Sequence, residues 1–228
     1  MPPTTSQGSV REIAALIDHT LLKAQATGAD IRRLCQEARQ YGFATVCVNP
    51  YWVALATSEL AASAVRVASV VGFPLGANTA VIKVAETEDA MAAGAREIDM
   101  VLNIGELCAG NLTAVAGGIA AVVAVAHARG AVVKVILETA LLSDDQKIAG
   151  CTLSQQGGAD FVKTSTGFST HGATVQDVAL MRRIVGPNMG VKASGGIRTL
   201  EDLQAMRAAG ANRIGTSSGV SIVEAMHS

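Results

Sequence analysis

The sequence predicts an α/β fold, namely a (β/α)8 TIM barrel formed by a single domain. Eight short segments rich in β-branched residues alternate with longer, Ala-rich amphipathic segments. Dividing 228 residues among eight units leaves about 28 for each, enough for one strand, one helix and two short loops. The expected strands cover residues 16–20, 44–48, 67–72, 97–102, 132–137, 160–164, 190–193 and 213–216.

Composition and glycine placement support the same fold. Half of the residues are hydrophobic and 16% are charged, which suits parallel strands buried on both faces by Ala-rich helices. Five expected helices end in a glycine that can take the left-handed conformation before the next strand: Gly42, Gly94, Gly130, Gly158 and Gly210. An open doubly wound sheet is the alternative, but residues 18–23, after the first strand, hold neither GxGxxG nor GxxxxGK[ST].

The bulk properties limit the domain count, the partners and the compartment. Residues 1–9 are polar, contain two prolines and lack the apolar run of a secretory signal, so we expect a flexible N-terminal tail before a barrel domain at residues 10–228. The formal net charge of −1 gives no reason to expect nucleic acid or a membrane surface as partner. The weakly polar run 112–126 is shorter than the ~18 residues that span a bilayer. Four cysteines without a CxxC pair favour reduced thiols and a cytoplasmic location over disulfides or zinc.

Lys163 lies in an otherwise apolar strand, where burying a charged amine is costly. One interpretation is a structural lysine that pairs with a buried carboxylate or points outward. The other is a nucleophile whose pKa is lowered by burial and by a neighbouring cation, because only the neutral amine attacks a carbonyl. Catalytic groups of barrels lie at the carboxyl ends of strands, which favours the nucleophile.

Lys192 and Asp99 could complete this site. Lys192 is on the next expected strand, and adjacent strands lie about 4.8 Å apart, so it could supply the cation. A phosphate ligand is its alternative role, since a Gly-rich loop follows. Alternation along the strand turns Asp99 inward, opposite to Ile98 and Met100, where it could exchange protons or serve as a structural ion-pair partner. Lys134 fits this charge network and a separate structural pair equally well.

Two loops rich in Gly and Ser follow expected strands seven and eight, the place where barrels often bind phosphate. They cover residues 194–198 and 215–219. Small residues let backbone N–H groups approach an anion, and a following helix adds a favourable dipole. Thr199 and Asp202 form the pattern of a capping box, which confines the first loop to a few residues. The sequence therefore predicts a ligand that carries a phosphate group.

Six ordered motifs extend these observations over nearly the whole chain, at residues 18–23, 71–76, 97–105, 134–139, 161–167 and 191–198. In these motifs the sequence resembles the deoxyribose-phosphate aldolases, class I aldolases of deoxynucleoside breakdown. The resemblance implies a (β/α)8 barrel without metal or other cofactor. It implies that a lysine Schiff base reversibly cleaves 2-deoxy-D-ribose 5-phosphate to acetaldehyde and D-glyceraldehyde 3-phosphate. It also implies a homodimer or a higher homo-oligomer.

Carried over by position, the resemblance assigns a role to each matching residue. Lys163 would form the Schiff base, while Asp99 and Lys192 would relay protons and tune its pKa. Asp18 and Thr20 match positions near the sugar hydroxyls and an active-site water. The phosphate-facing positions would be Gly167, Gly195, Gly196, Arg198, Gly215, Ser217 and Ser218.

The chain departs from this family's pattern in two places. Some members have a C-terminal tail with a tyrosine thought to assist proton transfer, whereas this chain ends in His227 and Ser228. His171 stands in the loop after the sixth strand, where a small residue is expected. A tail-assisted proton transfer is therefore in doubt for this chain.

Two other functions stay open at this level. The chain could be a different phosphosugar-acting (β/α)8 enzyme, such as an epimerase, an isomerase or another Schiff-base aldolase. It could also be a non-catalytic sugar-phosphate-binding protein, although two buried lysines would then lack a purpose. A metal-dependent aldolase is disfavoured, because the four histidines show no clustered ligand spacing.

Overall fold

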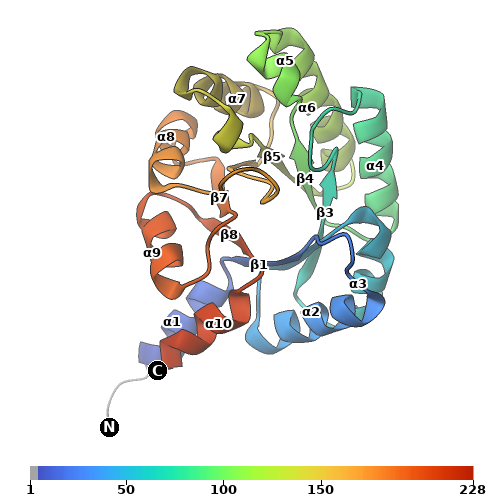
Figure 1. Cartoon of the computed structure of the whole chain (residues 1–228). Coiled ribbons are helices and arrows are strands. Elements are labelled where there is room, and N and C mark those ends of the chain that lie inside the picture. Colours follow the sequence, from blue (N-terminus) through green and yellow to red (C-terminus); the bar gives the residue numbers. More distant parts are fainter. Residues whose placement is uncertain (1–4, 228) are drawn as a thin grey trace.

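The computed structural model describes residues 5–227, with side chains from Val10 onward. Eight parallel strands close into a barrel in this range, in chain order from β1 to β8, and β8 pairs with β1 (Figure 1). The strands are β1 (Ile17–Leu21), β2 (Thr45–Val48), β3 (Arg66–Val71), β4 (Glu97–Val101), β5 (Val132–Ile136), β6 (Phe161–Lys163), β7 (Gly190–Ser194) and β8 (Arg213–Thr216). The predicted (β/α)8 barrel is thus confirmed.

Helices surround this barrel (Figure 1). The α-helices of the described residues are α1 (Thr5–Ala14), α2 (Gly28–Tyr41), α3 (Val53–Glu59), α4 (Ala80–Ala92), α5 (Ile104–Cys108), α6 (Leu112–His127), α7 (Asp144–Gln156), α8 (Val175–Val185), α9 (Leu200–Ala208) and α10 (Gly219–Glu224). Short 3-10 helices cover η1 (Pro50–Trp52), η2 (Thr139–Leu141) and η3 (Ala225–His227). Both α5 and α6 follow β4, so this unit carries one helix more than the repeat requires.

The local signals in the sequence specify these elements well. Each observed strand begins and ends within one residue of its expected bounds. All five glycines expected at helix ends have positive φ, for example 71° at Gly42 and 111° at Gly210. Capping boxes open α2, α7 and α9, and the box on α9 is the predicted pair of Thr199 and Asp202.

Helix α1 corrects the expectation of a tail over residues 1–9. It begins at Thr5, so residues 5–9 are helical, and residues 1–4 lie outside the described residues. The carboxyl half of α1 is anchored because Ile13 and Ala14 are buried, and the helix lies beside α10 (Figure 1). Once a turn is anchored, each further residue adds a backbone hydrogen bond, which extends the helix through a polar stretch.

The register of the strands fixes which side chains meet inside the barrel. Asp99 of β4 is level with Lys134 of β5, and Lys163 of β6 is level with Lys192 of β7. Aliphatic side chains fill the space between strands and helices. Inside the barrel, a small apolar cluster of Leu22, Cys47, Ala68 and Val70 packs on the side of β1 to β3. The charged residues therefore share the interior with a small apolar cluster.

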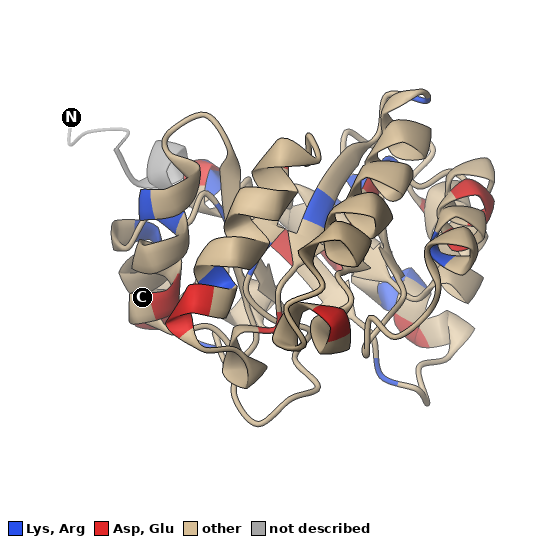
Figure 2. Cartoon of the chain, turned by 90° about the horizontal axis from the view of Figure 1, so that it is seen from above, with Lys and Arg blue, Asp and Glu red and all other residues tan. Residues whose placement is uncertain are grey.

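The outer surface carries both signs of charge. Figure 2 shows Lys and Arg positions interspersed with Asp and Glu positions over the helices. Helix α6, which holds the weakly polar run 112–126, buries one face through residues such as Val115, Ile119 and Val122. Among the described residues, the helices are too short or too polar to cross a bilayer.

Candidate active site

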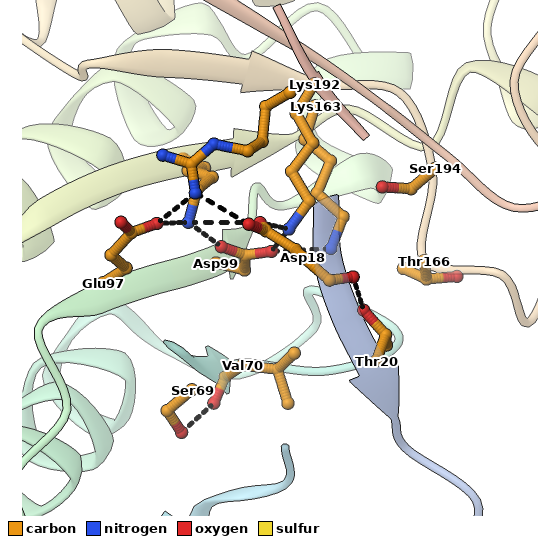
Figure 3. Close-up of polar contacts among 12 residues, drawn as sticks. Asp18, Thr20, Ser69, Val70, Glu97, Asp99, Lys163, Thr166, Lys192 and Ser194 are labelled. Carbon is orange, nitrogen blue, oxygen red and sulfur yellow. Dashed lines mark hydrogen bonds and ion pairs between the residues drawn. The ribbon is translucent and has the colours of Figure 1, made fainter. Parts of the chain in front are cut away.

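Asp99 lies at the centre of an ion-pair network inside the barrel (Figure 3). Its Oδ2 accepts hydrogen bonds from Nζ of Lys163 and from Nζ of Lys192, each over 2.7 Å. Its Oδ1 accepts a hydrogen bond from Nζ of Lys134 over 2.8 Å. None of the four side chains is more than 3% exposed. The structure thus brings together the three residues predicted for catalysis and places Lys134 in the same network.

Two more carboxylates and an arginine complete this network. Glu97 Oε2 lies 2.6 Å from Lys134 Nζ and 3.3 Å from an Arg213 nitrogen. Asp18 of β1 pairs with Lys192 and, over 2.7 Å, with Arg213. Glu97 was missed as a site residue, although it precedes Asp99 by two positions on β4 and therefore faces the same side.

The charges of this network are unequal. Three carboxylates, those of Asp18, Glu97 and Asp99, meet four cationic groups that lie within 3.5 Å of them, those of Lys134, Lys163, Lys192 and Arg213. One cationic group is therefore in excess if all of them are ionised. Neutralising one amine removes the excess, since a buried charge without a balancing partner is costly.

Lys163 is the amine whose environment favours the neutral form. Burial lowers the pKa of Lys163, and the Lys192 charge lowers it further, while Asp99 opposes both. Burial would also lower the pKa of Lys192, but Asp18 and Asp99 outweigh it and raise that pKa. Burial alone would raise the pKa of Asp99, yet Lys134, Lys163 and Lys192 hold it well below its usual value. The network therefore holds an ionised carboxylate beside a lysine whose pKa is lowered.

A cavity of about 370 Å³ opens over this network at the carboxyl ends of the strands. Lys163 lines the cavity, whereas Asp99 and Lys192 lie behind it and are not among the lining residues. Thr20, at the end of β1, also lines it and donates a hydrogen bond from Oγ1 to the carbonyl of Asp18 over 2.9 Å. A ligand in the cavity can therefore reach the Lys163 amine without displacing its charged partners.

The Gly and Ser loops predicted to bind phosphate line the same cavity. Six of the seven expected residues do so: Gly167, Gly195, Gly196, Arg198, Gly215 and Ser217. The first three have φ of 85°, 81° and 79°, the left-handed region that favours glycine. Ser194, which belongs to the expected loop 194–198 but was assigned no role of its own, also lines the cavity. Its hydroxyl has no hydrogen-bond partner among the described residues. The loops thus offer backbone and hydroxyl groups to an anion.

Two residues expected to contact the ligand lie outside the cavity. Asp18 is fully buried and holds ion pairs with Lys192 and Arg213, whereas Thr20, two residues later on β1, lines the cavity. Ser218 directly precedes α10, and its backbone N–H donates to Thr216 Oγ1 over 2.9 Å. His171 is an exposed loop residue outside the cavity lining.

Glu138 is a residue near the site that sequence reasoning missed. It is buried, and its φ of 60° is uncommon for a residue other than glycine. Its carboxylate accepts hydrogen bonds from the backbone N–H of Thr166, over 3.3 Å, and from the Thr166 hydroxyl. Glu138 thereby holds the loop that leads to Gly167. The sequence gives no signal for this role, because a Glu after a strand is ordinary.

This chain is similar to a family of aldolases. The family model of "DeoC/LacD family aldolase" matches residues 13–227. The deoxyribose-phosphate aldolase of Geobacillus sp. (strain WCH70) is 60% identical over 212 residues, which cover 93% of this chain and 95% of the relative. The deoxyribose-phosphate aldolase of Brevibacillus brevis (strain 47 / JCM 6285 / NBRC 100599) is 61% identical over 208 residues, which cover 91% and 93%.

A solved structure agrees with these relatives. The tetrameric structure of deoxyribose phosphate aldolase from Aeropyrum pernix matches with a TM-score of 0.91 and 37% identity, over 100% of this chain and 99% of that chain. The barrel and its lysine-lined cavity define a (β/α)8 enzyme of the aldolase class. The chain belongs to the DeoC/LacD family of aldolases, which confirms the expected family and activity class.

Proposed function

We propose that this aldolase reversibly cleaves 2-deoxy-D-ribose 5-phosphate to acetaldehyde and D-glyceraldehyde 3-phosphate through a Schiff base on Lys163. The observation that carries the proposal is the position of Lys163, whose Nζ lies 2.7 Å from Asp99 while its side chain lines the cavity. The names of the relatives at about 60% identity support the substrate.

The first half of the reaction forms the Schiff base. The neutral amine of Lys163 attacks the C1 aldehyde of the open-chain sugar, and loss of water gives an iminium. Lys192 keeps its proton because Asp18 and Asp99 raise its pKa, so it stays a cation beside the amine and favours the neutral form of Lys163. The iminium then draws electrons from the neighbouring carbon–carbon bond.

The second half breaks that bond. Removal of the proton from the C3 hydroxyl lets the C2–C3 bond break, and D-glyceraldehyde 3-phosphate leaves. The remaining enamine is protonated at C2 and hydrolysed to acetaldehyde, which restores the amine. Asp99 is the proton acceptor that we assign, and water carries the proton to it, because Asp99 does not line the cavity.

We assign the phosphate end of the sugar to the loops after β7 and β8, which line the same cavity as Lys163. The loops after β7 and β8 offer Gly195, Gly196 and Ser217, and Arg198 adds an exposed positive charge at the rim. Backbone N–H groups and a guanidinium are suitable donors for a phosphate. These contacts would orient C1 toward Lys163.

Borohydride trapping tests the proposal. Incubation with acetaldehyde followed by reduction should leave an N-ethyl group on the peptide that contains Lys163, and the variant Lys163→Ala should lose both the adduct and the cleavage activity. A phosphosugar isomerase or epimerase would give no adduct at Lys163, and a binding protein would bind the sugar phosphate without turnover. Lys147→Ala, which removes a lysine outside the cavity, is the matched control. Activity retained in Lys163→Ala would refute the assignment.

We also infer a homo-oligomer located in the cytoplasm. The tetrameric structure of the Aeropyrum pernix relative supports self-association. The four free cysteines suit a reducing compartment. Light scattering on the purified chain measures the oligomeric state, and the mass of a monomer would contradict this inference.

A further inference from the structure

Lys83 is a second buried lysine, and it lies outside the active site. It belongs to the first turns of α4, is 3% exposed, and donates one hydrogen bond from Nζ to the carbonyl of Val101 over 2.7 Å. Among the described residues, the lysines with a carboxylate oxygen within 4.0 Å of Nζ are Lys134, Lys147, Lys163 and Lys192, and not Lys83. An ammonium has three hydrogens to donate. The mechanism proposed above gives Lys83 no role.

Lys83 lines a cavity of about 210 Å³ between α4, α5, α6 and the end of β4. This cavity shares no lining residue with the active-site cavity. Its apolar lining includes Met100, Leu102 and Ile119. Besides Lys83, its polar and charged lining residues are Asn78, Thr79, Asn103 and Glu106. The volume and the lining suit a molecule of a few carbon atoms with one polar group that can meet the amine.

Burial changes the proton affinity of this amine. It lowers the pKa of Lys83 to about 8, against a smaller opposing effect of Glu86. Roughly a tenth of the Lys83 side chains are therefore neutral at pH 7, and about half at pH 8. An unperturbed lysine is almost wholly charged at both pH values.

We propose that Lys83 is a second imine-forming amine of this chain and that its cavity captures small aliphatic aldehydes such as acetaldehyde. Nζ adds to the carbonyl carbon, a carbon–nitrogen bond forms, and a proton moves from nitrogen to oxygen to give a carbinolamine. Water then leaves with the carbonyl oxygen and the two hydrogens of the amine, and the imine remains. The step is reversible and requires no oxidant. It rests on the proposed function only for the source of the aldehyde.

An imine at Lys83 would alter the strand that carries Asp99. Lys83 donates its hydrogen bond to the carbonyl of Val101, the last residue of β4. Asp99 lies two residues earlier on the same strand. A neutral imine has no N–H group, so Val101 would lose this hydrogen bond. Aldehyde that accumulates could thereby act on the strand that positions the proton acceptor.

Site-resolved labelling tests the proposal. The variant Lys163→Ala, which lacks the first imine site, is incubated with acetaldehyde, reduced with borohydride at pH 6 to 9, digested and analysed by mass spectrometry. Lys147 is the matched control, because Asp144 and Asp177 hold its amine at 3.0 and 2.7 Å and raise its pKa. We expect at least about tenfold more N-ethyl group on Lys83 than on Lys147 at pH 7.5. The Lys83 label should rise about tenfold from pH 7 to pH 9.

Each outcome separates this inference from the proposed function. In the unsubstituted chain, a label on Lys163 with Lys83 no more labelled than Lys147 overturns the inference and leaves the proposed function intact. A label on Lys83 without one on Lys163 supports the inference and overturns the proposed function. Lys83→Arg keeps the charge and a donor for Val101 and should abolish the label at that position. If this variant fails to fold, the comparison of Lys83 with Lys147 in Lys163→Ala decides alone.

Discussion

Lys163 and Lys192 donate hydrogen bonds to the same oxygen of Asp99, each over 2.7 Å. Two ammonium groups that share one carboxylate oxygen repel each other, so the pair is most stable when one of them is neutral. Lys192 has a second carboxylate, Asp18, and keeps its proton. Lys163 pairs with Asp99 alone among the described carboxylates and faces the cavity. The division of roles between the two lysines therefore follows from their partners.

Replacing Lys192 should make Lys163 a poorer nucleophile at neutral pH. In Lys192→Met the cation that lowers the pKa of Lys163 is gone, while Asp99 remains and raises that pKa. The neutral fraction of Lys163 at pH 7 then falls, so we expect kcat/KM to drop at least about tenfold and its acid limb to move to higher pH. A kcat/KM profile from pH 6 to 10 measures this. Lys147→Met serves as control. If the acid limb does not move in Lys192→Met, then Lys192 does not lower the pKa of Lys163.

Lys134 should matter for stability. It lies 2.6 Å from Glu97 and 2.8 Å from Asp99, and all three are buried. Removing one partner from a buried ion pair leaves an uncompensated charge, so Lys134→Met should lower the free energy of unfolding by about 3–5 kcal/mol. Urea unfolding at pH 7 measures the loss. Glu97→Gln in the same chain should restore part of it, and a single variant as stable as the parent would contradict the expectation.

Acid should destabilise the barrel through Asp99. Its pKa in the folded chain is well below the usual 3.8, at which it titrates when unfolded. Below about pH 4 the unfolded state therefore binds more protons, so the contribution of Asp99 is fully present above this pH and is lost as the pH falls. We expect the urea midpoint to fall more steeply from pH 5 to pH 3 in the parent chain than in Asp99→Asn. Equal slopes would show that Asp99 contributes nothing to acid sensitivity.

The sequence predicts the strands and the three central charged residues because these depend on local rules. Alternation along a strand turns Asp99 inward, and the order of strands in a barrel places Lys163 next to Lys192. Glycines with positive φ mark the phosphate-type loops in the same local way. Such features can be predicted from the neighbouring residues and the fold class alone.

The remaining partners depend on how the barrel closes. Arg213 reaches Asp18 across 195 positions of sequence because β8 pairs with β1, and the same closure brings it to Glu97. The ion pairs of Asp18 with Lys192 and Arg213, which keep it out of the cavity lining, join β1 to β7 and β8 and are not given by any local pattern. Glu138 meets Thr166 only after β5 and β6 pair. Long-range pairing therefore sets the details that the sequence leaves open.

Helix α6 offers a simple route to higher stability. Gly117 lies in its interior, and a Cβ added there would meet no atom within 4 Å. Glycine inside a helix costs about 0.5–1 kcal/mol relative to alanine, so Gly117→Ala should raise the melting temperature by about 2–4 °C at most. Differential scanning calorimetry measures the change, and kcat/KM should stay unchanged because Gly117 lies outside the active-site cavity. A lower melting temperature would indicate a contact that the structure does not show.

Gly215 should be intolerant of a side chain for a catalytic reason. A Cβ at this position would contact Ser194 Oγ and lie 3.0 Å from Cε of Lys192, so Gly215→Ala would displace the cation beside Lys163. A displacement of about 1 Å in a catalytic constellation can reduce the rate about 100-fold, and we expect a loss of that order in kcat/KM. Steady-state kinetics with circular dichroism measure the loss and the fold, with Gly117→Ala as the matched glycine control. If Gly215→Ala keeps kcat/KM within about twofold, Lys192 does not need its present position.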